Sequence, residues 1–106
     1  LFALGNRSGK ALAEALTFSR SFDVKKYGWE GAPLHDLTTI AYLLKPALFQ
    51  GRDINVSIET RSELTIGMTV ADYWRVTRRP VNARYIRDVD ADGFFALLTE
   101  RIGRLP

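Results

Sequence analysis

The spacing of apolar residues changes once along this chain, and that change most limits what the chain can fold into. Between residues 8 and 21, apolar side chains recur every three or four positions, as on one face of a helix. From Asn55 to Val70 they alternate with polar residues, as in strands that bury one face. Because the two patterns occupy separate blocks, we predict a mixed α+β structure.

Two helices are predicted in the first half of the chain. Residues 8–21 are rich in Ala and Leu and contain no proline, and residues 37–44 have several large apolar side chains. Pro46 should end the second helix because proline cannot continue it, and residues 47–49 are expected to add one turn. Residues 22–31, with two large aromatic side chains between glycines, are predicted to be a loop.

Three strands and a last helix are predicted in the second half. Residues 55–60 and 64–70 should form a β-hairpin, and residues 82–89 a third strand. Asp90 is a favourable N-cap, so a helix is expected from there to about Arg101. The order of two helices, three strands and a helix describes an α+β piece rather than a complete doubly wound sheet.

Composition excludes several classes of protein. No apolar run approaches the roughly 20 residues of a membrane-spanning helix, so no membrane partner is predicted. The absence of cysteine removes disulfides and thiolate metal sites, and it fits a reducing compartment, so we expect a cytoplasmic protein. Because the chain opens with Leu1 instead of methionine, we also expect it to be an internal piece of a longer protein.

The formal net charge of +3 could indicate a nucleic-acid partner, but the basic residues are scattered. Their densest cluster is Arg75, Arg78 and Arg79, which we interpret as a solvated loop. We therefore predict no nucleic-acid partner.

His35 and Asp36 are the strongest candidates for chemistry. His35 is the only histidine, and its imidazole can exchange a proton near neutral pH. A carboxylate supplies the hard oxygen that calcium and magnesium prefer. Equally, Asp36 could cap the following helix while His35 is an ordinary loop residue. The dipeptide alone leaves both interpretations open.

Two other motifs fail on spacing. Residues 5–11 have one residue too few between their glycines for a phosphate-binding loop, and Ala11 stands where Ser or Thr is required. The alternating aspartates of residues 88–92 lack the closing glutamate of a calcium-binding loop, because Thr99 occupies that position. We interpret them as capping and first-turn residues of the last helix.

Aromatic residues at four positions could stack on a nucleobase, since every base has a π-face. Tyr27 and Trp29 lie in the predicted loop. Tyr73 and Trp74 are predicted instead to belong to the hydrophobic core.

Most of the chain resembles the second half of the nucleoside hydrolase family, in particular the bacterial branch that includes pyrimidine-preferring enzymes. The segments that carry this resemblance are residues 31–36, 41–44, 56–60, 64–72, 82–84 and 89–90. We therefore expect residues 1–106 to be the C-terminal segment of a single nucleoside hydrolase domain, an incomplete piece of an α/β scaffold.

The resemblance implies hydrolysis of the N-glycosidic bond of ribonucleosides, small-molecule substrates, at a site with one calcium ion. His35 matches the family histidine that assists departure of the base, and Asp36 matches an aspartate that ligates calcium. Tyr27 falls in a variable region that often lines the base pocket. Leu37 stands where the family commonly has proline, which should affect the site little.

The aspartate-rich motif that supplies most calcium ligands and the general base in this family is absent from these residues. Calcium takes roughly six to eight oxygen ligands, and Asp36 can offer two at most. We therefore expect the N-terminal calcium-binding half to be absent and the segment alone to be inactive. The alternative is a non-catalytic binding or assembly module whose basic loop faces an acidic partner. In either case we expect a homo-oligomer, because unpaired strands of the 55–70 hairpin favour pairing between chains.

Overall fold

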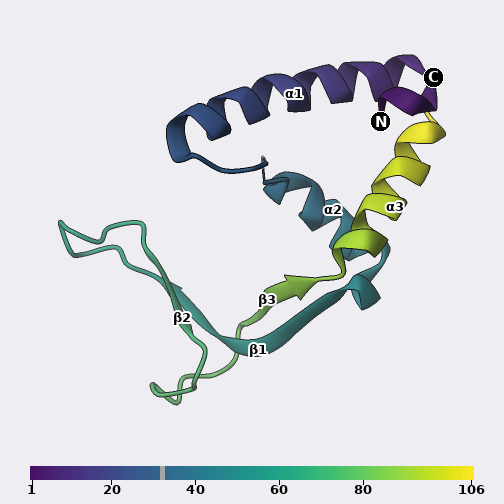
Figure 1. Cartoon of the computed structure of the whole chain (residues 1–106). Helices are drawn as coiled ribbons and strands as arrows, with labels where there is room; N and C mark the ends of the chain where they lie inside the picture. Colours follow the sequence, from purple (N-terminus) through teal and green to yellow (C-terminus); the bar gives the residue numbers. More distant parts are fainter. Residues whose placement is uncertain (32) are drawn as a thin grey trace. The chain divides into compact units, whose positions relative to one another are not determined.

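The computed structural model describes residues 1–31 and 33–106. Figure 1 shows the order of elements, which confirms the predicted succession of helix, helix, three strands and helix and the α+β class. The described residues include the α-helices α1 (Arg7–Tyr27), α2 (His35–Leu44) and α3 (Ala91–Gly103). The strands are β1 (Phe49–Ile58), β2 (Thr69–Asp72) and β3 (Ala83–Val89), and two short 3-10 turns are η1 (Phe2–Leu4) and η2 (Pro46–Leu48).

The chain divides into two compact units. The helical unit comprises Leu1–Leu48 and Asp90–Pro106, and the sheet unit comprises Phe49–Val89. The buried apolar side chains of the helical unit are Ala13, Ala41, Leu48, Phe94 and Leu97. In the sheet unit, Ile54 is completely buried.

The two ends of the chain lie side by side in the helical unit (Figure 1). The backbone N–H of Ser8 donates to the Pro106 carbonyl at 3.0 Å, and the Ser8 hydroxyl donates to the same oxygen at 2.8 Å. Asn6 accepts from the Gly9 N–H at 3.0 Å as the N-cap of α1, while its amide nitrogen donates to the Ile102 carbonyl at 2.8 Å. One side chain thus starts the first helix and binds it to the last.

Helix α1 is longer than predicted. The expected loop from residue 22 was wrong for Phe22–Tyr27, which continue the helix. This stretch contains no proline or glycine, and the helix ends only at Gly28, whose left-handed φ of 68° suits a residue without a side chain. Tyr27 and Trp29 therefore lie at the C-terminal end of α1 and not within a long loop.

Helix α2 begins at His35, two residues earlier than predicted. Leu34 occupies the N-cap position, and among the described residues no side chain caps this end of the helix. Both elements of the alternative interpretation were therefore wrong, since His35 is helical and Asp36 is a first-turn residue rather than the cap. Asp90, in contrast, is confirmed as the N-cap of α3, accepting from the Gly93 N–H at 3.0 Å.

The sheet is antiparallel in the order β2-β1-β3. The first part of β1 pairs with β3, from Phe49 opposite Val89 to Ile54 opposite Ala83, and its last part pairs with β2. The predicted hairpin is confirmed, but both of its strands were predicted with wrong bounds. The first spans Phe49–Ile58 instead of residues 55–60, so Phe49 belongs to the strand and not to the expected turn, and the second starts at Thr69 instead of Leu64. Residues 59–68 form hydrogen-bonded turns, including the Gly67 N–H donating to the Glu59 carbonyl at 2.8 Å.

The register of β1 against β3 shifts by one residue between Gln50 and Gly51. Gln50 pairs with Asp88 and Gly51 pairs with Ile86, so Arg87 has no residue opposite it. This is a β-bulge, which changes the direction in which the extra side chain points.

The core prediction was wrong for Trp74. Its indole is 76% exposed, whereas Tyr73 is half-buried. Trp74 follows the end of the short strand β2, in a turn where the Arg75 N–H donates to the Asp72 carbonyl at 3.1 Å. Past the end of β2, Trp74 lies in a turn instead of on a buried sheet face.

Candidate active-site segment

His35 and Asp36 are the first two residues of α2. Both are exposed, and the uncapped helix end exposes its first backbone N–H groups nearby. The hydroxyl of Thr39 donates to the Asp36 carbonyl at 2.7 Å, and Thr38 makes the equivalent bond to the His35 carbonyl. These bonds hold the backbone of the pair and leave both functional groups available.

Within the described part of the chain, no hydrogen bond or ion pair engages the His35 imidazole or the Asp36 carboxylate. Asp36 still has a favourable electrostatic position, because a negative charge in the first turn of a helix interacts well with the helix dipole. The helix dipole therefore explains why an aspartate is tolerated at this position. Its carboxylate oxygens remain available to a ligand.

A metal ion would find one ligand in this segment. Among residues 1–31 and 33–106, no three His, Cys, Asp or Glu side chains come together as a metal cluster. Because calcium takes roughly six to eight oxygens, Asp36 fits as one member of a ligand set but not as a whole site.

Tyr27 is the last residue of α1, and its ring is stacked on Trp29 with centroids 4.9 Å apart. Both rings are about half exposed, and the Lys26 ammonium lies 5.0 Å from the Tyr27 centroid. No ring contact or hydrogen bond joins Tyr27 to His35 or Asp36 in the residues described. The proposed base-binding role of Tyr27 therefore stays a prediction.

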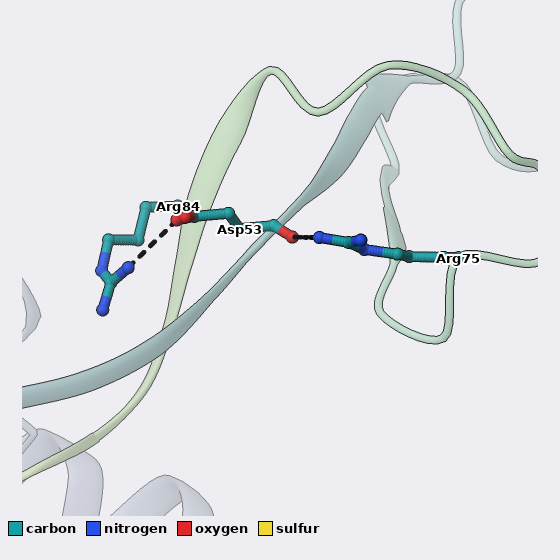
Figure 2. A network of polar contacts seen from close by, with 3 residues as sticks. All are labelled: Asp53, Arg75 and Arg84. Carbon is teal, nitrogen blue, oxygen red and sulfur yellow. Dashed lines mark hydrogen bonds and ion pairs between the residues drawn. The ribbon is translucent and has the colours of Figure 1, made fainter.

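The arginine cluster is a solvated loop, as predicted. Arg75, Arg78 and Arg79 are all exposed, and Arg75 and Arg78 have positive φ angles of 57° and 56°. Two of the three guanidinium groups contact their own unit. Arg75 donates to the Asp53 carbonyl at 3.2 Å (Figure 2), and Arg79 donates to the Ser57 hydroxyl at 3.3 Å. The loop is thus organised by internal contacts.

One polar hollow in the sheet unit was not anticipated. It has a volume of about 450 Å³ and is lined by Gln50, Gly51, Tyr73, Arg87 and Asp88. The available signal was Gly51, since a glycine within a strand often marks a bulge. Apolar and polar residues alternate too weakly around residue 50 for the sequence to place Gly51 in a strand.

Residues 1–96 match the family model of the inosine-uridine preferring nucleoside hydrolases. The chain belongs to this family. The match includes the His35–Asp36 pair and confirms the resemblance found in the sequence.

Curated relatives of this nucleoside hydrolase segment include ribonucleoside hydrolases, in agreement with the family match. An uncharacterized protein of Schizosaccharomyces pombe is 49% identical over 98% of the chain and 34% of its own length. The pyrimidine-specific ribonucleoside hydrolase RihA of Shewanella sp. strain MR-7 is 46% identical over 94% of the chain and 32% of its own length. The segment thus spans about a third of the proteins it matches.

A solved structure shares the fold of the segment. The purine-preferring ribonucleoside hydrolase from Gardnerella vaginalis superposes with a TM-score of 0.75 over 95% of this chain and 32% of its own, at 24% identity. Members of the nucleoside hydrolase family use a metal ion. No helix in the described residues is long and apolar enough to cross a membrane.

Proposed function

We propose that the whole protein hydrolyses the N-glycosidic bond of ribonucleosides, and that this segment, its C-terminal part, contributes His35 and Asp36. The observation that carries the proposal is the first turn of α2, where His35 and Asp36 stand side by side, exposed, with neither functional group engaged by a hydrogen bond or ion pair among the described residues. The segment alone should be inactive, because its described residues bring together no cluster of three metal-ligating side chains around Asp36.

In this proposal, His35 assists the leaving base. The bond between ribose C1′ and the base nitrogen breaks with its electron pair on the base. A water oxygen bonds to C1′ and passes a proton to a general base supplied by the rest of the protein. A proton or hydrogen bond from a His35 ring nitrogen stabilises the charge that develops on the base. The unengaged imidazole suits this role, since no protein acceptor within the described residues competes for its proton.

Asp36 would supply one carboxylate ligand to a calcium ion whose other ligands come from the rest of the protein. When bound, the ion would supply a positive charge that orients and acidifies water. The contribution of this chain is to hold the Asp36 carboxylate at the start of α2, where the Thr39 hydroxyl donates to the Asp36 backbone carbonyl.

Pyrimidine nucleosides are the proposed substrates. The relatives named pyrimidine-specific share 44–46% identity with the chain, whereas the purine-preferring structure shares 24%. Tyr27 is proposed to contact the base, since its ring is half exposed and stacked on Trp29. Comparison of kcat/KM for uridine, cytidine and inosine tests the preference, and a higher value for inosine would contradict it.

The role of His35 is tested by His35→Ala in the complete protein. General acid assistance contributes about 10²- to 10⁴-fold, so kcat for uridine should fall within that range. KM should change little, because the imidazole acts on the leaving base rather than on the ribose. A variant with normal kcat would exclude the assignment.

The role of Asp36 is tested by Asp36→Asn, with Asp92→Asn as the matched control. Asp92 is likewise the second residue of its helix, α3, so both substitutions remove one favourable helix-dipole interaction. Only Asp36→Asn should weaken calcium affinity, by about tenfold or more. Equal calcium affinities in the two variants would show that Asp36 is not a ligand.

The parent enzyme is proposed to be a cytoplasmic homo-oligomer. The 106 residues of this segment contain no cysteine, which fits a reducing compartment, and β2 pairs only with β1 in the described sheet, leaving an edge. Sedimentation should show a species larger than one chain. The alternative of a basic binding module is not favoured, because Arg75 and Arg79 are engaged within their own unit.

A further inference from the structure

The β-bulge of the sheet unit builds a hollow on its surface. Arg87 is the extra residue of β3, between Ile86, which pairs with Gly51 on β1, and Asp88, which pairs with Gln50. A Cβ atom on Gly51 would lie 2.6 Å from the Tyr85 carbonyl oxygen, so a side chain there would require the strands to shift. The missing side chain and the redirected arginine together form the polar hollow of about 450 Å³.

Two guanidinium groups gather on one ring beside this hollow. The Cζ atoms of Arg52 and Arg87 each lie 5.1 Å from the Tyr73 ring centroid. Arg52 is fixed further by donating to the Tyr73 carbonyl at 3.1 Å. The Arg87 guanidinium also donates a hydrogen bond to the Tyr73 side chain, and this contact is the largest cause that raises the pKa of Arg87 above its usual value.

The positive charge around the hollow is only partly balanced. Asp88 is the one carboxylate that lines it, and one of its oxygens accepts from the Val89 N–H at 2.9 Å. The neighbouring Arg84 pairs with Asp53 at 3.1 Å (Figure 2), whereas no carboxylate of the described residues forms an ion pair with Arg52 or Arg87. An anion is the ligand that this arrangement favours, because a guanidinium recognises oxyanions through paired N–H groups.

An exposed aromatic surface adjoins these cations. Trp74 packs edge-on against Tyr73 with centroids 5.1 Å apart, and the Arg52 Cζ lies 5.8 Å from its ring. Since 76% of the indole is exposed, it can accept a flat heterocycle. The Arg52 guanidinium and the exposed Trp74 ring are therefore neighbours on the surface of the sheet unit.

We propose that the hollow is a binding site for a nucleoside monophosphate, with the phosphate at Arg87 and Arg52 and the base stacked on Trp74. The site does not include His35 or Asp36, and its ligand differs from the proposed substrate in carrying a phosphate group. It would allow the protein to respond to nucleotides without hydrolysing them there.

Calorimetric titration of the full-length protein with uridine monophosphate and with inorganic phosphate tests this proposal. Arg87→Gln should weaken binding of both ligands by about tenfold or more. The matched control is Arg84→Gln on the same strand, which removes an equal charge from an arginine already paired with Asp53 and should leave both affinities unchanged. Trp74→Ala should weaken binding of uridine monophosphate by about fivefold or more and leave binding of inorganic phosphate unchanged.

Arg87→Lys serves as a second variant that keeps the charge and should retain part of the affinity, with unfolding temperature checked for each variant. Binding that is equal in Arg87→Gln and Arg84→Gln would overturn the proposal, as would an absence of saturable binding of both ligands. Uridine hydrolysis by Arg87→Gln should stay normal. Failure of the catalytic proposal would appear separately, as normal kcat in His35→Ala.

Discussion

The side chain of Asn82 forms two hydrogen bonds with the backbone of Val56. The Val56 N–H donates to the Asn82 amide oxygen at 2.8 Å, and the Asn82 amide nitrogen donates to the Val56 carbonyl at 2.9 Å. Backbone pairing between β1 and β3 ends where Ile54 faces Ala83. The side-chain amide therefore continues the ladder for one more step, in place of a strand residue.

Asn82→Ala should destabilise the protein by about 1–2 kcal/mol, because two exposed hydrogen bonds are lost and each is worth roughly 0.5–1.5 kcal/mol. Asn82→Asp is the matched variant, since its carboxylate can accept from the Val56 N–H but cannot donate to the Val56 carbonyl. The stability of Asn82→Asp should lie between that of Asn82→Ala and that of the unsubstituted protein. Urea unfolding measures both, and equal stability of the alanine variant and the unsubstituted protein would show that water replaces the amide without cost.

Asp90→Ala should destabilise α3 by about 1 kcal/mol, the usual effect of removing an N-cap. The Asp90 carboxylate accepts from the Gly93 N–H, whereas Asp92 lies in the first turn without a capping bond. Asp92→Ala is therefore the control and should cost only about 0.3–1 kcal/mol. The free energy of unfolding from urea titration compares them, and the interpretation fails when Asp92→Ala is the more destabilising.

Local chemistry made some elements predictable from the sequence. Asp90 before an apolar helical pattern gave a correct helix start, and the alternation around Val56 gave the hairpin. Helix ends without such a signal were missed. His35 starts α2 although Leu34 has no capping side chain, and Phe22–Tyr27 continue α1 because only Gly28 ends it.

The candidate site was identifiable only in part, for a physical reason. His35 and Asp36 are adjacent in sequence, so their proximity required no knowledge of the fold. The hollow beside Arg87 depends on a bulge and on Tyr73, which lies in a different segment. Such an arrangement depends on strand register, which alternation of apolar residues does not determine to within one residue.

The stability of the loop after β2 should depend on pH through Asp72. Its carboxylate accepts from the Val76 N–H at 2.7 Å and from the Thr77 N–H at 2.9 Å. The hydrogen bond from the Thr77 hydroxyl is the largest cause that holds the pKa of Asp72 below its usual value. Because the folded loop binds this proton more weakly than the unfolded chain, the contribution is complete above about pH 4 and is lost as pH falls further.

Hydrogen exchange of the Val76 and Thr77 amides between pH 5 and pH 2, corrected for intrinsic rates, would follow this loss. Asp72→Asn should reduce protection of these amides already at neutral pH and remove most of its pH dependence. Glu59 serves as an internal comparison, because backbone N–H groups, first that of Arg61, also lower its pKa. Its own turn should loosen with acid in both proteins. Protection of Val76 that stays constant with pH would contradict the role of Asp72.

Phe94 and Phe95 form a natural pair for testing the core of the helical unit. They are consecutive residues of α3 with ring centroids 5.2 Å apart, but Phe94 is 4% exposed and Phe95 is 51% exposed. Phe94→Ala should destabilise the protein by about 3–5 kcal/mol, because it removes a buried ring and leaves a cavity. Phe95→Ala deletes the same atoms from a largely solvated position and should cost less than half as much. Thermal and urea unfolding of both variants measure the difference, and equal losses would mean that Phe95 is covered in the complete protein by residues outside this segment.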